Sequence, residues 1–225
     1  MHFAERNLSM KIKTCCIQSA DEVKMAIEAG VTAAGFITQI PNSSGTIKDE
    51  QTRALCEEFY GNIQTWLLTS QTDEKELRKQ LQTFKISHLQ IVDYVDIGIC
   101  IRLKKQYPWV EFVQVIHVLS VADIERAIVA QEWASILLLD SGNRDADKLG
   151  STDNTPDWSL SRQIIDAVDI PAYLAGGLNS DNVAQAIESV GPAGVDVCSG
   201  LRRNDVLQPD LLEQFVKEVA QTQKR

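Results

Sequence analysis

Two adjacent cysteines, Cys15 and Cys16, lie where the first β-rich run of the chain ends, at residues 11–15. Successive residues of a strand point to opposite faces, so only one of the two thiols can face a given side of the sheet. A thiolate is a base, but a free thiol ionises only near pH 8.5, so this chemistry would need a nearby positive charge such as Lys13. The alternative is that both cysteines are small buried apolar residues, the usual fate of free cysteine.

A carboxyl group, Asp140, follows another apolar run, at residues 135–139. At the end of a buried strand it would be partly shielded from water. Burial raises the pKa of a carboxyl group and lets it hold a proton at neutral pH, which is the property that an acid catalyst needs. The alternative role for Asp140 is to cap a helix or loop.

Two glycine-containing turns follow two neighbouring β-rich runs near the C-terminus. Gly176 and Gly177 follow residues 172–175, and Ser199 and Gly200 follow residues 195–198. Without side chains, the backbone N–H groups of such turns can approach an anion, and the dipole of a following helix favours negative charge. A tight connection would also use glycine, but two such turns at neighbouring strand ends favour a phosphate site.

The elements that would position these groups are β-rich runs that alternate with amphipathic segments along nearly the whole chain. This alternation predicts βα units with parallel strands, and the near-continuous apolar runs fit strands that are buried on both faces. The eight predicted strands are residues 11–15, 33–37, 64–68, 88–92, 112–117, 135–139, 172–175 and 195–198. An open, doubly wound sheet is the alternative, but eight units in this length favour an α/β fold of the closed (β/α)8 TIM barrel type. In that barrel the active site lies at the C-terminal ends of the strands.

The chain length of 225 residues, 44% of them hydrophobic, suits a single domain. We expect the barrel to occupy residues 11–225 and residues 1–10 to be a mobile N-terminal extension. Ser19 and Glu22 have the spacing of a capping box and predict the start of the first helix, which Gly30 would end.

Charge and cysteine spacing exclude several classes of partner. The net charge of −9 disfavours nucleic acid and anionic membrane surfaces. The apolar runs are far shorter than a membrane span, and residues 1–10 contain no apolar segment of signal-peptide type, so we expect a cytoplasmic protein. The five cysteines form no CxxC pair and no Cys/His cluster with metal-site spacing, so we expect reduced thiols and no metal.

Several of these segments resemble the phosphoribosylanthranilate isomerase family of tryptophan biosynthesis, and the likeness runs from Lys11 to the last predicted helix. The matching motifs are K-T-C-C-I at residues 13–17, A-G-F at 34–36, L-L-L-D-S at 137–141, L-A-G-G-L-N at 174–179 and G-V-D-V-C-S-G at 194–200. The resemblance implies an aldose–ketose isomerase that converts an aminoaldose to an aminoketose by an Amadori rearrangement. Its substrate would be a small phosphorylated sugar that carries an aromatic amine, and the reaction would need no cofactor.

The resemblance also implies roles for individual residues. Cys15 would be the general base that removes a proton from sugar C2, and Asp140 the general acid that protonates the furanose ring oxygen. Asp196 would hold the sugar or amine part of the substrate, with Gln90 and His117 as further substrate contacts. The phosphate would be held by Gly176, Gly177, Ser199 and Gly200.

Some ligand-facing positions depart from the family pattern. The family motif S-P-R, whose arginine meets the anthranilate carboxylate, is represented by residues 43–45 without an arginine, and Lys48 and Arg53 are the nearby cations. The family's Q-L-H-G is represented by residues 90–93, and His117 would compensate in part for the missing histidine. Cys16 stands where the family has glycine, and the glycine-rich loop of the family is represented by the more acidic residues 150–158.

Three functions therefore stay open. The first is the isomerase itself. The second is a diverged paralogue that processes another phosphosugar, and the third is a non-catalytic barrel that binds a phospholigand. We expect the protein to be a monomer in each case.

Overall fold

The computed structural model describes residues 10–38, 40, 45–141 and 158–223. Residues 1–9 of the expected N-terminal extension lie outside the described residues. Within the described residues, no helix is both long enough and apolar enough to cross a bilayer.

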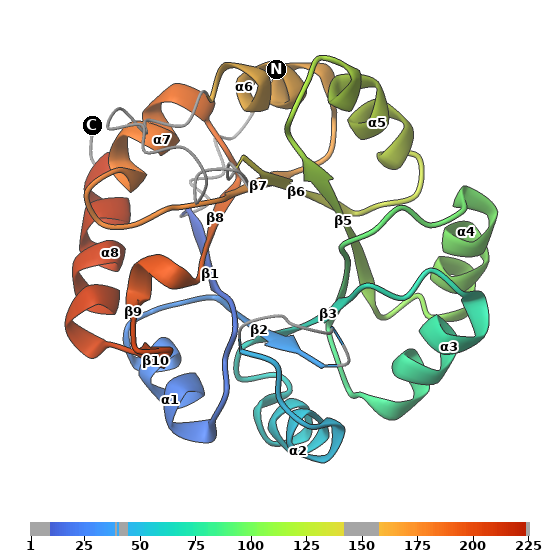
Figure 1. The fold of residues 1–225 in the computed structure, drawn as a ribbon, viewed down its shortest axis with the longest axis horizontal. Helices are drawn as coiled ribbons and strands as arrows, with labels where there is room; N and C mark the ends of the chain where they lie inside the picture. The colour runs from blue at the N-terminus through green and yellow to red at the C-terminus, as the bar shows by residue number, and fades with distance from the viewer. Residues whose placement is uncertain (1–9, 39, 41–44, 142–157, 224–225) are drawn as a thin grey trace, which may run out of the picture.

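Eight parallel strands form a closed barrel in sequence order, and eight α-helices surround it (Figure 1). The barrel strands are β1 (Lys11–Thr14), β2 (Ala33–Ile37), β3 (Gln64–Thr69), β4 (His88–Ile91), β5 (Glu111–His117), β6 (Ile136–Asp140), β7 (Ala172–Ala175) and β8 (Gly194–Val197). The predicted barrel is confirmed, and every predicted strand boundary lies within one residue of the observed one. The prediction succeeds because strands that are covered on both faces are apolar throughout and are separated by polar turns.

The helices follow the strands in strict alternation, as right-handed βα units require. They are α1 (Ala20–Glu28), α2 (Asp49–Phe59), α3 (Glu74–Thr83), α4 (Ile97–Gln106), α5 (Ala122–Ala130), α6 (Ser159–Ala167), α7 (Val183–Val190) and α8 (Pro209–Thr222). Between β8 and α8 the chain forms a short 3-10 helix, η1 (Ser199–Leu201), and a two-stranded hairpin of β9 (Arg202–Arg203) and β10 (Val206–Leu207).

Helix α1 begins as the capping-box pattern predicts, because the Ser19 hydroxyl accepts a hydrogen bond from the backbone N–H of Glu22 at 3.2 Å. The reciprocal half of the box differs. The Glu22 carboxylate accepts from the backbone N–H of Gln18 at 2.8 Å, one residue before the cap. Gly30, in the left-handed region with φ of +85°, follows the helix end as predicted.

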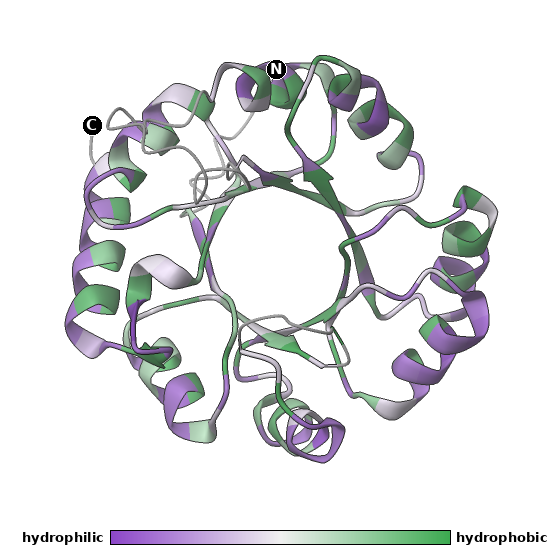
Figure 2. Ribbon diagram, viewed as in Figure 1, coloured by the Kyte–Doolittle hydropathy of each residue, from purple (hydrophilic) through white to green (hydrophobic). Residues whose placement is uncertain are grey.

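Two apolar layers hold the barrel together. The larger layer lies between the strands and the helices and contains outward-facing strand residues such as Phe36, Leu89 and Leu137. The smaller layer fills the barrel interior around Trp66, on which the buried ring of His88 stacks at a centroid distance of 4.5 Å. Figure 2 shows the mainly hydrophobic strands at the centre and the helices of mixed character around them. Side chains therefore fill the interior of the barrel, as is usual for this fold.

Candidate active site

A cavity of about 390 Å³ lies at the C-terminal ends of the strands. Its size is in the range of small-molecule sites. Eight of the nine predicted site residues line it, namely Cys15, Gln90, His117, Asp140, Gly176, Gly177, Asp196 and Ser199. Gly200 does not line the cavity. The barrel therefore brings together residues that are spread from position 15 to position 199 of the sequence.

Cys15 follows the last residue of β1, and its backbone N–H donates to the carbonyl oxygen of Val197 in β8 at 2.9 Å. The Cys15 side chain is buried but borders the cavity. A Cβ placed on Gly35 of β2 would lie 3.1 Å from the Cys15 Sγ and 3.0 Å from the Lys13 Nζ. The missing side chain of Gly35 thus leaves the space that the thiol and the ammonium group occupy side by side.

Cys16 differs from the simple alternation of a strand. β1 ends at Thr14, and Cys16 has a φ of +62°, a left-handed conformation that costs a non-glycine residue about 1–2 kcal/mol. Cys15 lines the cavity and Cys16 does not, but both belong to one buried cluster with Ile37 and Leu68. The expectation of one thiol on each face of a strand does not apply here, because β1 ends before the two cysteines and the left-handed turn keeps Cys16 in the cluster of Cys15.

A buried ion pair lies directly beneath Cys15. The Lys13 Nζ and the Asp196 Oδ2 are 2.8 Å apart, and their side chains are 0% and 8% exposed. The two residues are register partners in the β1–β8 ladder. Burial opposes the charged form of Lys13, but Asp196 and the Cys15 sulfur outweigh it and raise the pKa of Lys13 above its usual value. Lys13 is therefore a positive charge next to the thiol at neutral pH.

Asp196 keeps one oxygen available towards the cavity. Burial raises the pKa of Asp196, while the neighbouring Lys13 favours the charged carboxylate. The Asp196 Oδ1 is buried and has no hydrogen-bond partner in the described part of the chain. Because an unpaired buried acceptor is costly, this oxygen is suited to bind a donor group of a ligand.

The environment of Cys15 favours the thiolate. The neighbouring Cys16 thiol has the largest effect and lowers the pKa of Cys15; burial opposes it, and the charge of Lys13 supports it. The neighbouring Cys15 and Cys198 thiols, together with burial, raise the pKa of Cys16. Cys16 therefore stays protonated, and Cys15 is the thiol that ionises.

The carboxyl group of Asp140 lies across the cavity from the thiol, three strands away around the closed barrel. Asp140 is the last residue of β6 and pairs in register with His117, the last residue of β5. The His117 Nδ1 and the Asp140 Oδ2 are 3.4 Å apart, and the two side chains are 26% and 31% exposed. The Asp140 side chain is thus partly shielded from water, as the sequence predicts, and the His117 ring lies beside it.

Gln90 contributes an amide to the same cavity from β4. Its side chain is 4% exposed, and its Oε1 has no hydrogen-bond partner among the residues that the structure describes. The amide oxygen therefore offers a ligand a second buried acceptor, across the barrel from the Asp196 oxygen, since β4 and β8 are four strands apart.

The two glycine turns meet at the other side of the cavity. Gly176 and Gly177 have φ values of +98° and +66°, which only glycine adopts at little cost. Ser199 begins η1 and lines the cavity. A Cβ on Gly200 would lie 2.1 Å from the carbonyl oxygen of Leu178, so the absence of a side chain at Gly200 lets the two turns touch. Gly200 shapes this wall from behind rather than lining it.

The comparisons with known proteins agree with this geometry. The family profile described as N-(5'-phosphoribosyl)anthranilate (PRA) isomerase matches residues 12–218. The chain belongs to the PRA isomerase family. N-(5'-phosphoribosyl)anthranilate isomerase 2 of Methanosarcina mazei is 29% identical over 203 residues, which are 90% of each chain. The corresponding isomerase of Nostoc punctiforme is 29% identical over 86% of this chain and 90% of its own.

Solved structures of PRA isomerases have the same barrel. The enzyme of Thermotoga maritima superposes with a TM-score of 0.80 at 25% identity, and the superposition covers 94% of this chain and 98% of the Thermotoga chain. The enzyme of Thermococcus kodakaraensis also superposes with a TM-score of 0.80 at 25% identity and covers 93% and 98%. The chain thus has the fold of an aldose–ketose isomerase family over nearly its whole length.

Two departures from the PRA isomerase pattern face each other in the structure. Where the resemblance predicts a glycine the chain has Cys16, and where it predicts an arginine the chain has Gly45. A Cβ on Gly45 would lie 2.5 Å from the Cys16 Cβ, so the cysteine leaves no room for a side chain at position 45. Lys48 and Arg53, the predicted replacements for the arginine, are exposed and do not line the cavity. Residues 43–44 and 150–157 lie outside the described residues.

The sequence predicts Lys13 as a charge beside the thiol but not its ion pair with Asp196, although a lysine inside a strand buried on both faces is itself a signal of such a pair. It assigns no role in the site to three further residues, Cys198, Arg202 and Glu22. Cys198 lines the cavity beside Ser199. Arg202 and Glu22 hold the backbone at the two cysteines, and no local pattern indicates that pairing. Within the described residues, no three His, Cys, Asp or Glu side chains form a metal-site cluster.

Proposed function

We propose that this protein catalyses the Amadori rearrangement of N-(5'-phosphoribosyl)anthranilate to its aminoketose isomer, the isomerase step of tryptophan biosynthesis. One observation carries the proposal. A thiol beside a buried ammonium group and a half-buried carboxyl group line the same cavity, three barrel strands apart. Membership of the PRA isomerase family supports the same reaction.

Asp140 begins the reaction as the general acid. It donates a proton to the furanose ring oxygen, and the bond between this oxygen and sugar C1 breaks as the amine nitrogen forms a C=N⁺ bond to C1. His117, whose Nδ1 lies 3.4 Å from the carboxyl oxygen, orients the acid. The ring-opened iminium is the species whose C2 proton is acidic.

Cys15 then acts as the general base. Its thiolate removes the proton from C2, and the electron pair of that C–H bond forms the C1=C2 bond of an enolamine while the iminium nitrogen becomes neutral. Protonation at C1 and loss of the proton of the C2 hydroxyl give the ketose. Lys13 stabilises the thiolate before the proton transfer, and the Asp196 Oδ1 accepts a hydrogen bond from the sugar or the amine.

The phosphate is held at the glycine turns, by backbone N–H groups of Gly176 and Gly177 and by Ser199, with Gly200 allowing the close approach of the two turns. Gln90 binds a donor group of the substrate through its unpaired amide oxygen. These residues bind and orient the substrate, and an acid and a base suffice for the proton transfers, so the reaction proposed here uses no cofactor.

A second candidate function is the same rearrangement on a phosphosugar with a different aglycone. One observation favours it. No arginine or lysine is among the described residues that line the cavity, although the family pattern has an arginine for the anthranilate carboxylate. A neutral aromatic amine would not need that cation.

We further propose that one barrel domain, residues 11–225, acts as a monomer in the cytoplasm. The acid, the base and the glycine turns of the proposed site all belong to one barrel. Sedimentation equilibrium tests this proposal: a monomer has the mass of one chain, 25.0 kDa.

Activity is tested by rescue of a tryptophan auxotroph that lacks the isomerase, and by the loss of PRA fluorescence with purified protein. The wild type is expected to rescue growth. Cys15→Ala and Asp140→Ala are each expected to lower kcat by about 10²- to 10⁴-fold, the usual effect of removing a general base or acid. Cys56→Ala, at a buried cysteine of α2 outside the cavity, is the matched control and keeps wild-type turnover.

Folded wild-type protein that neither rescues growth nor turns over PRA would contradict the first candidate function. The same assay with a phosphoribosylated amine that lacks the carboxylate then tests the second. If neither substrate is turned over, the remaining function is that of a non-catalytic barrel that binds a phospholigand.

A further inference from the structure

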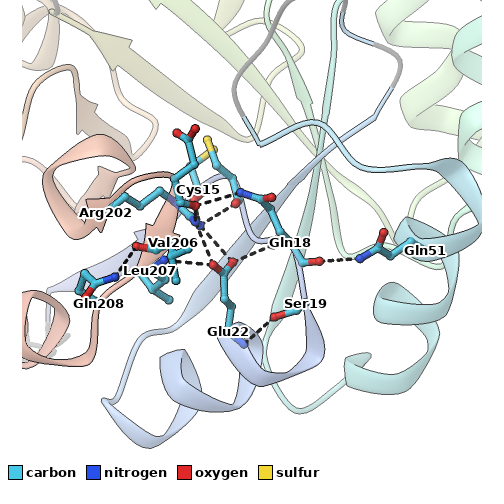
Figure 3. A network of polar contacts seen from close by, with 11 residues as sticks. Cys15, Gln18, Ser19, Glu22, Gln51, Arg202, Val206, Leu207 and Gln208 are labelled. Carbon is cyan, nitrogen blue, oxygen red and sulfur yellow. Dashed lines mark hydrogen bonds and ion pairs between the residues drawn. The ribbon is translucent and has the colours of Figure 1, made fainter.

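Arg202 and Glu22 form a buried ion pair beneath the backbone at Cys15 (Figure 3). Arg202 is the first residue of β9, and Glu22 lies in the first turn of α1. The guanidinium Nη1 lies 2.9 Å from one carboxylate oxygen and Nη2 lies 3.1 Å from the other. The side chains are 5% and 11% exposed, so the pair is fixed and little screened by solvent.

The carboxylate of this pair is anchored by backbone groups on both sides. Glu22 accepts hydrogen bonds from the N–H groups of Gln18 at 2.8 Å and Leu207 at 3.2 Å. Arg202 also donates to the carbonyl oxygen of Asp205 at 2.8 Å. The pair therefore ties the loop after β1 to the hairpin after β8.

The guanidinium also holds the two cysteines through their backbone. Its Nη2 donates to the carbonyl oxygen of Cys16 at 2.6 Å and lies 3.4 Å from that of Cys15. These two carbonyls belong to the peptide groups on either side of the Cys16 Cα, so holding them fixes the direction of the chain at the residue with the left-handed φ of +62°. A strained conformation of this kind persists only where surrounding contacts determine it.

The conformation of Cys16 decides where its thiol lies. In an extended strand the side chains of residues 15 and 16 would point to opposite faces. In the left-handed conformation Cys16 packs in the same buried cluster as Cys15, with Ile37 and Leu68. Gly45 leaves the space for this arrangement, because a Cβ there would lie 2.5 Å from the Cys16 Cβ.

We propose that Arg202 and Glu22 are positioning residues of the isomerase: they hold Cys16 in the conformation in which its thiol donates a hydrogen bond to the sulfur of the base, Cys15. The inference rests on the proposed function in assigning Cys15 as the base. Cys16 is then a second functional thiol, which keeps Cys15 in the form that accepts a proton. The direction in which Cys16 shifts the pKa of Cys15 agrees with this role.

The test measures the ionisation of Cys15 directly. The rate of alkylation of Cys15 by iodoacetamide is followed by peptide mass spectrometry from pH 5 to 10, and kcat/KM for PRA is measured over the same range. The variants are Cys16→Ala, which removes the donor, Cys16→Ser, which retains a hydroxyl donor, and Arg202→Met. Arg203→Met is the matched control, because Arg203 is the next residue and pairs with Asp210 on the surface.

Cys16→Ala and Arg202→Met are each expected to raise the apparent pKa of Cys15 alkylation by about one unit, which is a tenfold lower thiolate fraction at neutral pH. The acidic limb of kcat/KM moves by the same amount. Cys16→Ser is expected to stay within about threefold of the wild type, since a hydroxyl is a hydrogen-bond donor as well. Arg203→Met is expected to match the wild type.

An unchanged alkylation pKa in folded Cys16→Ala overturns the proposal. If Arg202→Met does not fold, Glu22→Gln replaces it, and an unchanged pKa there removes the positioning role of the pair. Alkylation needs no turnover, so the two hypotheses can fail separately: a shifted pKa in a protein without isomerase activity refutes the proposed function and keeps the thiol arrangement.

Discussion

Replacing Lys13 with methionine removes the ammonium group at the centre of the site and leaves the Asp196 carboxylate buried without its partner. Asp196→Asn does the reverse and leaves the ammonium group unpaired. The two variants test whether the Lys13–Asp196 ion pair stabilises the site, since the two charges are 2.8 Å apart and their side chains are 0% and 8% exposed.

The expected magnitude follows from the distance. Two unit charges 2.8 Å apart attract each other by about 6 kcal/mol at an effective dielectric constant of about 20. The cost of removing both groups from water offsets much of this attraction, but a single replacement leaves one buried charge unpaired and costs about 3–5 kcal/mol. We therefore expect each single variant to lose about 3–5 kcal/mol of unfolding free energy. The loss in the Lys13→Met/Asp196→Asn double variant is expected to be smaller than the two single losses added together, by at least about 2 kcal/mol.

The assay is urea unfolding at pH 7, monitored by tryptophan fluorescence because Trp66 lies in the barrel interior next to Lys13. Arg203→Met with Asp210→Asn, the exposed pair, forms the control cycle, and little coupling is expected there. Lys13→Met is also expected to raise the pKa of Cys15 alkylation, since a cation beside the thiol is lost. Additivity of the two single variants within about 0.5 kcal/mol would refute the reasoning, because independent sites add to that accuracy.

Two further predictions concern residues around the site. Gly45→Ala is expected to lower the unfolding free energy by more than the roughly 1–2 kcal/mol that a positive φ costs, because the new Cβ would lie 2.5 Å from the Cys16 Cβ. In a Cys16→Gly background the same change is expected to cost less, since the clash is absent there. Equal losses in both backgrounds would contradict this. Asp123→Asn is expected to cost about 1–2 kcal/mol at pH 7, because the carboxylate accepts from the N–H groups of Leu119 and Ser120. Burial opposes the charged form of Asp123, but these bonds and Arg126 lower its pKa, so the stabilisation is present above the unfolded value of about 3.9 and is lost as the pH falls through the lower folded pKa. Urea unfolding at pH 7 and pH 3 checks this, and a difference that grows on acidification would contradict it.

The local pattern of the sequence predicted the elements well. The apolar runs gave all eight strands to within one residue, and Ser19 marked the start of α1. The same pattern indicated which residues end the strands, so that Cys15, Asp140 and the glycine turns were predicted at the barrel mouth. These predictions depend on periodicity and on the conformational preferences of single residues, which act over a few positions.

Contacts between distant segments were not predictable in this way. Nothing near Arg202 indicates that its guanidinium lies beneath Cys16, 186 positions away. The cysteine at position 16 does not itself indicate a left-handed φ, because that conformation is rare for a residue other than glycine; only the glycine that the resemblance predicts there points to it. Both depend on the packing of the hairpin after β8 against the loop after β1.

The sequence by itself determined the barrel, the order of its units and the set of residues at its mouth. Each of these follows from which positions must be buried along a strand or helix. The tertiary structure alone decided that Asp196 pairs with Lys13, that His117 meets Asp140 and that both cysteine thiols lie together. The physical reason is that barrel closure and strand register set the distances between strand ends, and only those distances decide which polar groups compensate one another once they are removed from water.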